Sequence, residues 1–301
     1  MSSHTKIDFG WVVQPVPRSL EGRPTLLADN QKFLELIRYK FQTAWLEDHF
    51  QWNDRDTLEG WTHLAYLMPH FPELRFGTLV LGQAYRSPAL LAKMAATLHA
   101  LSGGRFILGI GAGWKEDEYR AYGWPFPSPG RRVRELEEYA AIIKAKWAHS
   151  PATFTGKYYS IKDAYCEPRP NPMIPLMIGG NGEKGTLKVT AQYADWWNFP
   201  LRTAELFGQK VNVLKQHCDA IGRDINDITL TAFEFVSLSN DPAKVVRPSQ
   251  MHHVAGNPDE VTRELEQFVQ AGARHFMLRF VDFPRTEGIE LFMEKVLPRF
   301  R

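Results

Sequence analysis

The stretch RFGTLVLGQAYRSPALLAKMAATLHALSGGRFILGIGAG, residues 75–113, decides the fold. It begins with a short apolar run (75–82), continues with a segment of helical spacing (87–101) and ends with a second apolar run (105–113). Ser87 and Pro88 are typical of a helix start, because serine caps the first turn and proline fits its first position. Two strands joined through a helix pair in parallel, since a parallel strand needs a crossover connection. The stretch therefore predicts a βαβ unit.

The same alternation repeats along the whole chain. We expect strands at 7–15, 43–50, 75–82, 105–113, 175–180, 195–200, 228–239 and 274–280. We expect helices at 30–41, 58–68, 87–101, 130–147, 183–194, 204–221, 257–272 and 288–300, and a proline-rich excursion at 150–172 with a short ribbon at 152–160. No linker separates these units. The pattern predicts a single (β/α)8 TIM barrel domain over residues 1–301 with insertions in its βα loops; an open doubly wound sheet is the alternative.

Composition excludes several classes of function. The chain has 36 basic and 34 acidic residues, a formal charge of +2, so we expect neither nucleic acid nor a membrane surface as partner. Cys166 and Cys218 are its two cysteines, and no zinc-binding spacing occurs, so we expect no metal. No apolar run long enough for a signal sequence or a membrane span is present, and we expect a cytoplasmic protein.

The glycine-rich segment GGNGEKG, residues 179–185, contains the spelling Gly-x-Gly-x-x-Gly. A dinucleotide fingerprint should lie on the first βα turn, with an acidic residue about 20 positions later. Here the segment follows four earlier units, and the nearest acid, Glu205, falls within the next predicted helix. Gly179, Gly180 and Gly182 instead lie where a strand gives way to a helix, a place suited to a phosphate. A tight turn without a ligand is the alternative.

In a (β/α)8 barrel the active site lies at the carboxyl ends of the strands. The segments to inspect are therefore Asp48-His49-Phe50, Leu79 to Gly82, Ala112-Gly113-Trp114, Gly179 to Gly182, and Asn198.

With these segments assembled, the chain resembles the luciferase-like monooxygenase superfamily, and within it the branch that uses the deazaflavin coenzyme F420. The blocks that carry the resemblance are WLEDHF (45–50), residues 75–127 and residues 175–199. The resemblance implies a (β/α)8 barrel with the cofactor across its carboxyl face. It implies that the tricyclic ring packs on Leu79 and Val80, joined by a non-proline cis peptide bond, and that the cofactor phosphate lies against Gly180, Asn181 and Gly182.

The remaining cofactor contacts that we expect are Asp48, His49, Ala112, Gly113, Gly179 and Asn198. Some deazaflavin enzymes of this superfamily carry a catalytic acid directly after the glycine-rich turn of the fourth strand, where this chain has Trp114. We therefore transfer no acid to that place. Glu116, Asp117 and Glu118 follow, and acids at a helix start are first of all favourable partners of its dipole.

His49 is the candidate catalytic residue, because an imidazole exchanges a proton near neutral pH. The alternative is a histidine that only hydrogen-bonds the cofactor. Asp48 either orients His49 or satisfies backbone donors. Trp52, Trp114 and Trp197 are candidates for the wall of a substrate pocket, although each is equally a core residue. Asn198 ends a strand where its amide faces either the ring edge or a substrate.

The leading hypothesis is hydride transfer between F420 and a small organic substrate, which we expect to be apolar or flat. The alternatives are an FMN-dependent monooxygenase using dioxygen, a non-catalytic flavin- or deazaflavin-binding protein, and an isomerase or lyase of phosphorylated substrates. The last would need an inward-pointing acid such as Glu47 or Glu234. We interpret His252 and His253 as loop residues and not as metal ligands. A homodimer through the barrel helices is implied by the resemblance, and the sequence leaves the oligomeric state open.

Overall fold

The computed structural model describes residues 6–17, 24–248 and 251–301. Its strands are β1 (Asp8–Val12), β2 (Thr43–Leu46), β3 (Arg75–Thr78), β4 (Leu81–Gly82), β5 (Phe106–Gly111), β6 (Ala152–Thr155), β7 (Ser160–Ala164), β8 (Leu176–Gly179), β9 (Trp196–Pro200), β10 (Thr229–Leu238), β11 (His253–Gly256) and β12 (His275–Phe280). Its α-helices are α1 (Leu26–Ile37), α2 (Gly60–Leu67), α3 (Pro88–Leu101), α4 (Glu116–Ala121), α5 (Pro129–Ala148), α6 (Thr186–Tyr193), α7 (Ala204–Asp219), α8 (Pro258–Gln270) and α9 (Glu287–Leu291).

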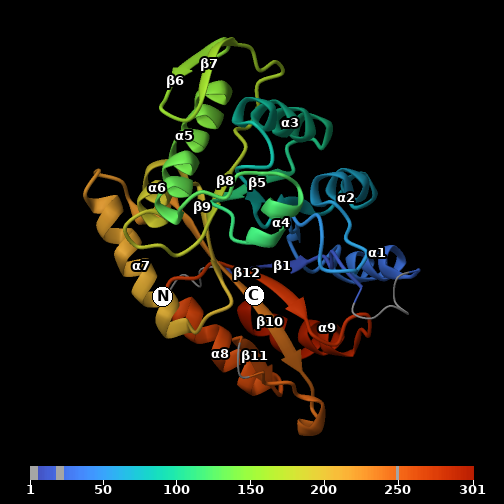
Figure 1. Cartoon of the computed structure of the whole chain (residues 1–301). Helices are drawn as coiled ribbons and strands as arrows, with labels where there is room; N and C mark the ends of the chain where they lie inside the picture. The colour runs from blue at the N-terminus through green and yellow to red at the C-terminus, as the bar shows by residue number, and fades with distance from the viewer. Residues whose placement is uncertain (1–5, 18–23, 249–250) are drawn as a thin grey trace.

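The barrel is a closed ring of parallel strands. Its order is β1, β2, β3, β5, β8, β9, β10 and β12, and β12 pairs back to β1 with Asp8 opposite His275. The connecting helices lie around the outside of this ring (Figure 1). A right-handed crossover through a helix places each following strand beside the previous one and covers its outer face. The predicted (β/α)8 fold is confirmed.

Two apolar layers fill the space inside and outside the ring of strands. The inner layer consists of Val12, Trp45, Leu79, Ile107, Met177, Phe233 and Met277. Alternate residues of the strands, such as Phe276 and Leu278 of β12, join the larger outer layer under the helices. A Cβ atom at Gly77 would collide with the Trp45 indole, so glycine at this position lets tryptophan fill the barrel interior.

Two helices begin with clear side-chain caps. The Ser87 side chain accepts a hydrogen bond from the Leu90 amide, and α3 begins with Pro88. Asn257 and Glu260 form a reciprocal capping box at the start of α8. Short polar signals of this kind depend on neighbours in the sequence, which explains why the sequence predicts them well.

The structure corrects several predicted boundaries. The strand expected at 43–50 ends at Leu46, because the following residues leave the sheet to build the rim of the barrel. The helix expected from residue 183 begins at Thr186, since the glycine turn extends to Gly185. The last helix is interrupted after Leu291 by a wider π-turn at Phe292–Val296.

A short strand also lies where we expected only a polar loop. His253–Gly256 forms β11, which pairs in parallel with Phe235 to Leu238 of β10. β9 pairs with the earlier part of the same strand, from Thr229 to Phe233. β11 therefore pairs with the part of β10 that extends beyond the end of β9. The interpretation of His253 as a loop residue was wrong.

The insertion after α5 forms the expected ribbon. β6 and β7 pair antiparallel, with Phe154 opposite Ile161, and project beside the end of α5, away from the ring of strands (Figure 1). Across the described ranges, no helix combines the length and the apolar character that a membrane crossing requires.

Candidate functional site

The third strand is interrupted at the position expected for the cofactor ring. β3 ends at Thr78, β4 resumes at Leu81, and the peptide bond between Leu79 and Val80 is cis, as the resemblance implied. A Cβ atom at Gly111 would lie 2.7 Å from Val80 Cγ2, and one at Gly179 would lie 3.0 Å from Val80 Cγ1. Two glycines on neighbouring strands thus make room for the valine side chain beside the interior of the barrel.

His49 lies at the rim beyond β2 and is held by a distant glutamate. Its Nδ1 is 3.2 Å from Glu118 Oε2, and the imidazole is 11% exposed while the glutamate side chain is fully buried. Glu118 also accepts hydrogen bonds from the backbone amides of Phe50 and Gln51 and from the Tyr85 hydroxyl. A carboxylate on Nδ1 favours the tautomer with the proton at Nδ1, which leaves Nε2 as the basic nitrogen.

The charge of Glu118 is stabilised by these donors. Burial by itself raises the pKa of the carboxyl group, but the hydrogen bonds from His49, Phe50 and Gln51 outweigh it and hold the pKa below its usual range. Glu118 is therefore an anion at neutral pH. From the sequence we interpreted Glu118 first of all as a favourable partner of the helix dipole and did not place it against His49. The one available signal was the run of three acids after the glycine-rich turn.

Two of the three candidate tryptophans lie beside the imidazole. The ring centroids of Trp52 and Trp114 are 5.1 Å and 5.7 Å from that of His49, both edge to face. Trp114 is 67% exposed, and Lys115 Nζ lies 5.1 Å from the centroid of Trp52. A large exposed indole beside a titratable ring is suited to bind a flat ligand.

Trp197 does not belong to this wall. Its side chain is fully buried in the outer layer, where it stacks on Phe207 of α7 with the centroids 5.4 Å apart. Its indole Nε1 donates to the carbonyl of Gly180 at 2.8 Å. The prediction of a substrate contact was wrong, because alternation along β9 turns this side chain toward the helices. Trp197 instead fixes the glycine turn from behind.

Asp48 has a structural partner and does not contact His49. Its carboxylate accepts two hydrogen bonds from Arg86, at 2.9 Å and 3.1 Å, and one from the Gly82 amide at 3.1 Å. The side chain is fully buried, so a direct contact with a cofactor is not available to it. Asp48 thus satisfies a backbone donor, as one of the two alternatives had it, and a cofactor contact through its main chain stays a prediction.

In the part of the chain that the structure describes, the glycine turn after β8 leaves several backbone amides without an acceptor. Gly180 has φ of +127°, a conformation that L side chains rarely adopt, and its amide donates to the carbonyl of Asn198. Within the described residues, the amides of Asn181, Gly182 and Glu183 donate to no acceptor. Three free donors before a helix suit a phosphate group, so the residues present fit the phosphorylated cofactor that the resemblance implied.

The other predicted cofactor residues border the same region. Asn198 points into the barrel, where its Nδ2 donates to Thr231 Oγ1 at 3.2 Å and lies 3.4 Å from Met277 Sδ. Gly113 has φ of +74°, and a Cβ there would collide with the Tyr119 hydroxyl. Ala112, directly before it, is half-buried. Their contact with a cofactor stays a prediction.

The two acids considered for an isomerase or lyase, Glu47 and Glu234, each form an ion pair with another side chain. Glu234 lies between Phe233 and Phe235, which face inward, so its own side chain faces the helices. There its Oε2 lies 2.9 Å from His252 Nδ1. The other ring nitrogen, His252 Nε2, lies 2.8 Å from Oε1 of Glu264 on α8. The two flanking carboxylates overcome the effect of burial and raise the pKa of His252 to about 9. Glu47 instead pairs with Arg279 inside the barrel mouth.

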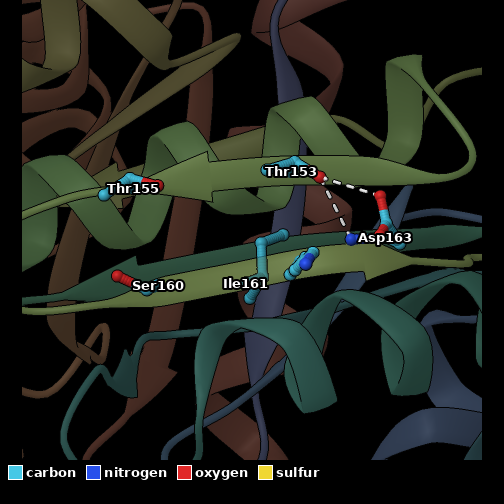
Figure 2. Close-up of a pocket in the computed structure, with 6 residues that line it drawn as sticks. Thr153, Thr155, Ser160, Ile161 and Asp163 are labelled. Carbon is cyan, nitrogen blue, oxygen red and sulfur yellow. Dashed lines mark hydrogen bonds between the residues drawn. The ribbon is translucent and has the colours of Figure 1, made fainter.

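A hollow of about 400 Å³ lies elsewhere, against the β6–β7 ribbon. Figure 2 shows Thr153 and Asp163 facing one another on adjacent strands, with the Asp163 amide donating to Thr153 Oγ1 at 3.0 Å. The residues that line this hollow all come from the β6–β7 ribbon, and none of them is a predicted site residue. Among the described residues, no three His, Cys, Asp or Glu side chains gather in a way that could hold a metal ion.

The family model for "Luciferase-like monooxygenase" matches residues 7–276 of this sequence. The chain belongs to the luciferase-like monooxygenase family. An uncharacterized protein of Mycobacterium tuberculosis is 33% identical to this family member over 169 residues, which cover 56% of this chain and 58% of that protein. Pyrimidine monooxygenase RutA of Escherichia coli is 29% identical over 193 residues, or 62% of this chain and 48% of RutA. The chain thus spans about half the length of these curated relatives.

Solved structures resemble this luciferase-like protein over nearly its full length. An F420-dependent secondary alcohol dehydrogenase in complex with an F420–acetone adduct has a TM-score of 0.85 at 20% identity and covers 98% of this chain and 99% of its own. The oxygenating constituent of 3,6-diketocamphane monooxygenase of Pseudomonas putida, in complex with FMN, has a TM-score of 0.76 at 14% identity, with coverages of 98% and 99%. At these identities the likeness shows the fold alone.

Proposed function

We propose that this chain is an oxidoreductase that transfers a hydride between coenzyme F420 and a small organic substrate, with His49 exchanging the accompanying proton. Family membership supports redox chemistry with a flavin or deazaflavin. The observation that carries the finer proposal is the buried contact between His49 and Glu118 beside two tryptophans. It provides a proton carrier that is 11% exposed and is backed by a buried anion.

Bound F420 would supply a carbon centre, C5, that gives or accepts a hydride. The amides of Asn181, Gly182 and Glu183 would hold its phosphate, and the Leu79–Val80 segment would support its ring. Glu118 keeps the proton of the imidazole at Nδ1, so Nε2 takes or releases a proton on the substrate side. The imidazolium that forms is stabilised by the buried anion. Trp52 and Trp114 would orient a flat substrate beside the imidazole.

The alternative with reduced FMN and dioxygen shares the barrel and the phosphate cradle. RutA and the FMN-containing neighbour belong to that class. The sequence WLEDHF favours F420, because flavin members of the family often carry a pair of histidines in this region. A protein that only binds a cofactor would need no buried anion behind the imidazole.

Titration of the purified chain with F420 and, separately, with FMN tests the proposal. We expect a change in the absorbance spectrum of F420 that saturates at a lower concentration than that of FMN. Tight FMN binding without affinity for F420 would overturn the choice of cofactor. The absorbance spectrum of protein isolated from its native host would show independently which chromophore it carries.

A further inference from the structure

A second charged pair lies inside the barrel mouth, apart from His49 and Glu118. Arg279 alternates along β12 with His275 and Met277, which face the interior. Its Nη2 donates to Glu47 Oε2 at 2.7 Å and to the Val13 carbonyl at 3.3 Å. The two side chains are only 9% and 17% exposed. Residues that follow two strands, β1 and β2, thus hold the guanidinium of Arg279 at the carboxyl end of the barrel.

Aromatic rings hold the guanidinium on its other sides. The Arg279 guanidinium carbon lies 5.5 Å from the ring centroid of Phe233 and 5.6 Å from that of Phe235. Both phenylalanines come from β10, the neighbour of β12. Contacts of this kind attract a cation and leave it poorly hydrated. The arginine therefore has a fixed position in an apolar surrounding.

The guanidinium has spare donors. Its Nε is buried and has no acceptor within the described residues. A buried donor without a partner costs about 1–3 kcal/mol, so an acceptor brought by a ligand would be bound with preference. Arginine presents five N–H donors in a rigid fork, and the contacts described above occupy only Nη2.

The pair is close in sequence to the proposed proton carrier. Glu47 is separated from His49 by one residue, and Thr43 and Trp45, which precede it at the same spacing on β2, face the interior. Arg279 and Glu47 therefore lie at the carboxyl end of the barrel, where β2 gives way to the segment that carries His49.

The charge balance of the pair decides what kind of oxygen it accepts. Arg279 and Glu47 together are neutral, so a carboxylate beside them would leave an uncompensated negative charge in a desolvated place. A carbonyl oxygen of a neutral compound would satisfy the free donors without that cost. We infer that Arg279, held by Glu47, binds the carbonyl oxygen of a flat, neutral substrate such as a ketone, amide or lactone, and that Glu47 excludes carboxylates. This inference rests on the proposed function, because it assigns the substrate class of the same mouth.

Two matched pairs of probes test it: benzamide against benzoate, and nicotinamide against nicotinate. Dissociation constants would be measured on the full chain by ligand-observed NMR, with and without F420. The wild type should bind each amide at least about tenfold more tightly than its acid. Glu47→Gln should reverse this preference, because the arginine is then free to pair with a carboxylate. Arg279→Met should weaken amide binding at least about tenfold, and Arg279→Lys should restore it only in part.

Arg263→Met on the exposed face of α8 and Glu294→Gln, whose side chain is 66% exposed, are the matched controls and should behave as the wild type. Circular dichroism verifies that each variant is folded. A wild type that prefers the acids, that binds neither member of a pair, or that is unaffected by Arg279→Met would overturn the inference. Cofactor titration separates the two proposals: normal F420 binding without discrimination among probes refutes only the carbonyl site, whereas discrimination without F420 binding refutes only the proposed cofactor.

Discussion

Nδ1 of His49 lies 3.2 Å from Oε2 of Glu118, across 69 positions of the sequence. The glutamate lies in the first turn of a short helix after β5, and the histidine follows β2. The two elements meet only because the carboxyl ends of the parallel strands share one rim. An imidazole backed by a buried carboxylate is a common arrangement for proton exchange, since the carboxylate fixes the tautomer and stabilises the charged ring.

Replacing His49 by alanine tests whether this residue exchanges a proton with the substrate. Turnover of a substrate found by screening carbonyl compounds with F420 should fall by about 10²- to 10⁴-fold, because general acid–base catalysis is lost. The dissociation constant of the cofactor, measured by absorbance, should change by less than about threefold. Equal losses of turnover and of cofactor affinity would favour a histidine that only binds the cofactor.

Glu118→Gln should act through His49 and not through the cofactor. The amide keeps the shape of the side chain but loses the charge-assisted hydrogen bond, so kcat should fall about 10- to 100-fold with little change in KM. The ¹⁵N NMR signals of the His49 ring should report the Nδ1–H tautomer in the wild type and a mixture in the variant. An unchanged tautomer with reduced stability would indicate a purely structural glutamate.

Asp48→Ala should destabilise the rim of the barrel. It leaves the side chains of the proposed reaction unchanged. Arg86 would lose a buried bidentate partner, and we expect the free energy of unfolding to decrease by about 3 kcal/mol, measured by urea denaturation. Glu116→Gln removes the exposed pair with Arg120 and should cost about 0.5 kcal/mol or less. Similar costs for the two variants would contradict the buried role of Asp48.

Gly180→Ala should weaken cofactor binding. With φ of +127° the added methyl group strains the backbone and lies 3.1 Å from Thr186 Cγ2, which displaces the turn that presents the free amides. The dissociation constant of the cofactor should rise at least about tenfold. Gly222→Ala is the matched control, because Gly222 has φ of +71° and open space around it, at a turn after α7. An effect of equal size in both variants would point to general destabilisation.

Two buried histidines should make the fold sensitive to acid. Burial lowers the pKa of His63 to about 4 and that of His275 to about 3. Below about pH 6.5 the unfolded chain protonates these residues while the folded chain does not. Their contribution to stability is therefore complete above that pH and falls with decreasing pH, by up to about 1.4 kcal/mol per unit for each histidine.

Urea unfolding at about pH 7 and about pH 5 measures this loss. His63→Gln should reduce the difference between the two conditions, whereas the exposed His70→Gln should leave it unchanged. The same pH dependence in His63→Gln and in the wild type would show that protons bind elsewhere on unfolding.

Local signals in the sequence were sufficient for the frame of the molecule. The cap at Ser87 was predicted because such contacts join neighbouring residues. The cis bond at Leu79–Val80 followed from the resemblance to the family and was confirmed. β11 was not predicted, because a strand of four residues becomes stable only beside its long partner β10. Trp197 was misplaced, because its position depends on which face of β9 turns inward.

By itself, the sequence determined the alternation of strands and helices, their parallel pairing and the glycines that free the backbone after β8, because each of these depends on periodicity or on the conformation of single residues. Only the tertiary structure decided the partners of the charged side chains. In the structure Asp48 pairs with Arg86, His49 pairs with Glu118, and Glu47 pairs with Arg279. Such pairings join residues far apart in the chain, and ring closure and side-chain direction, which no local pattern encodes, bring them together.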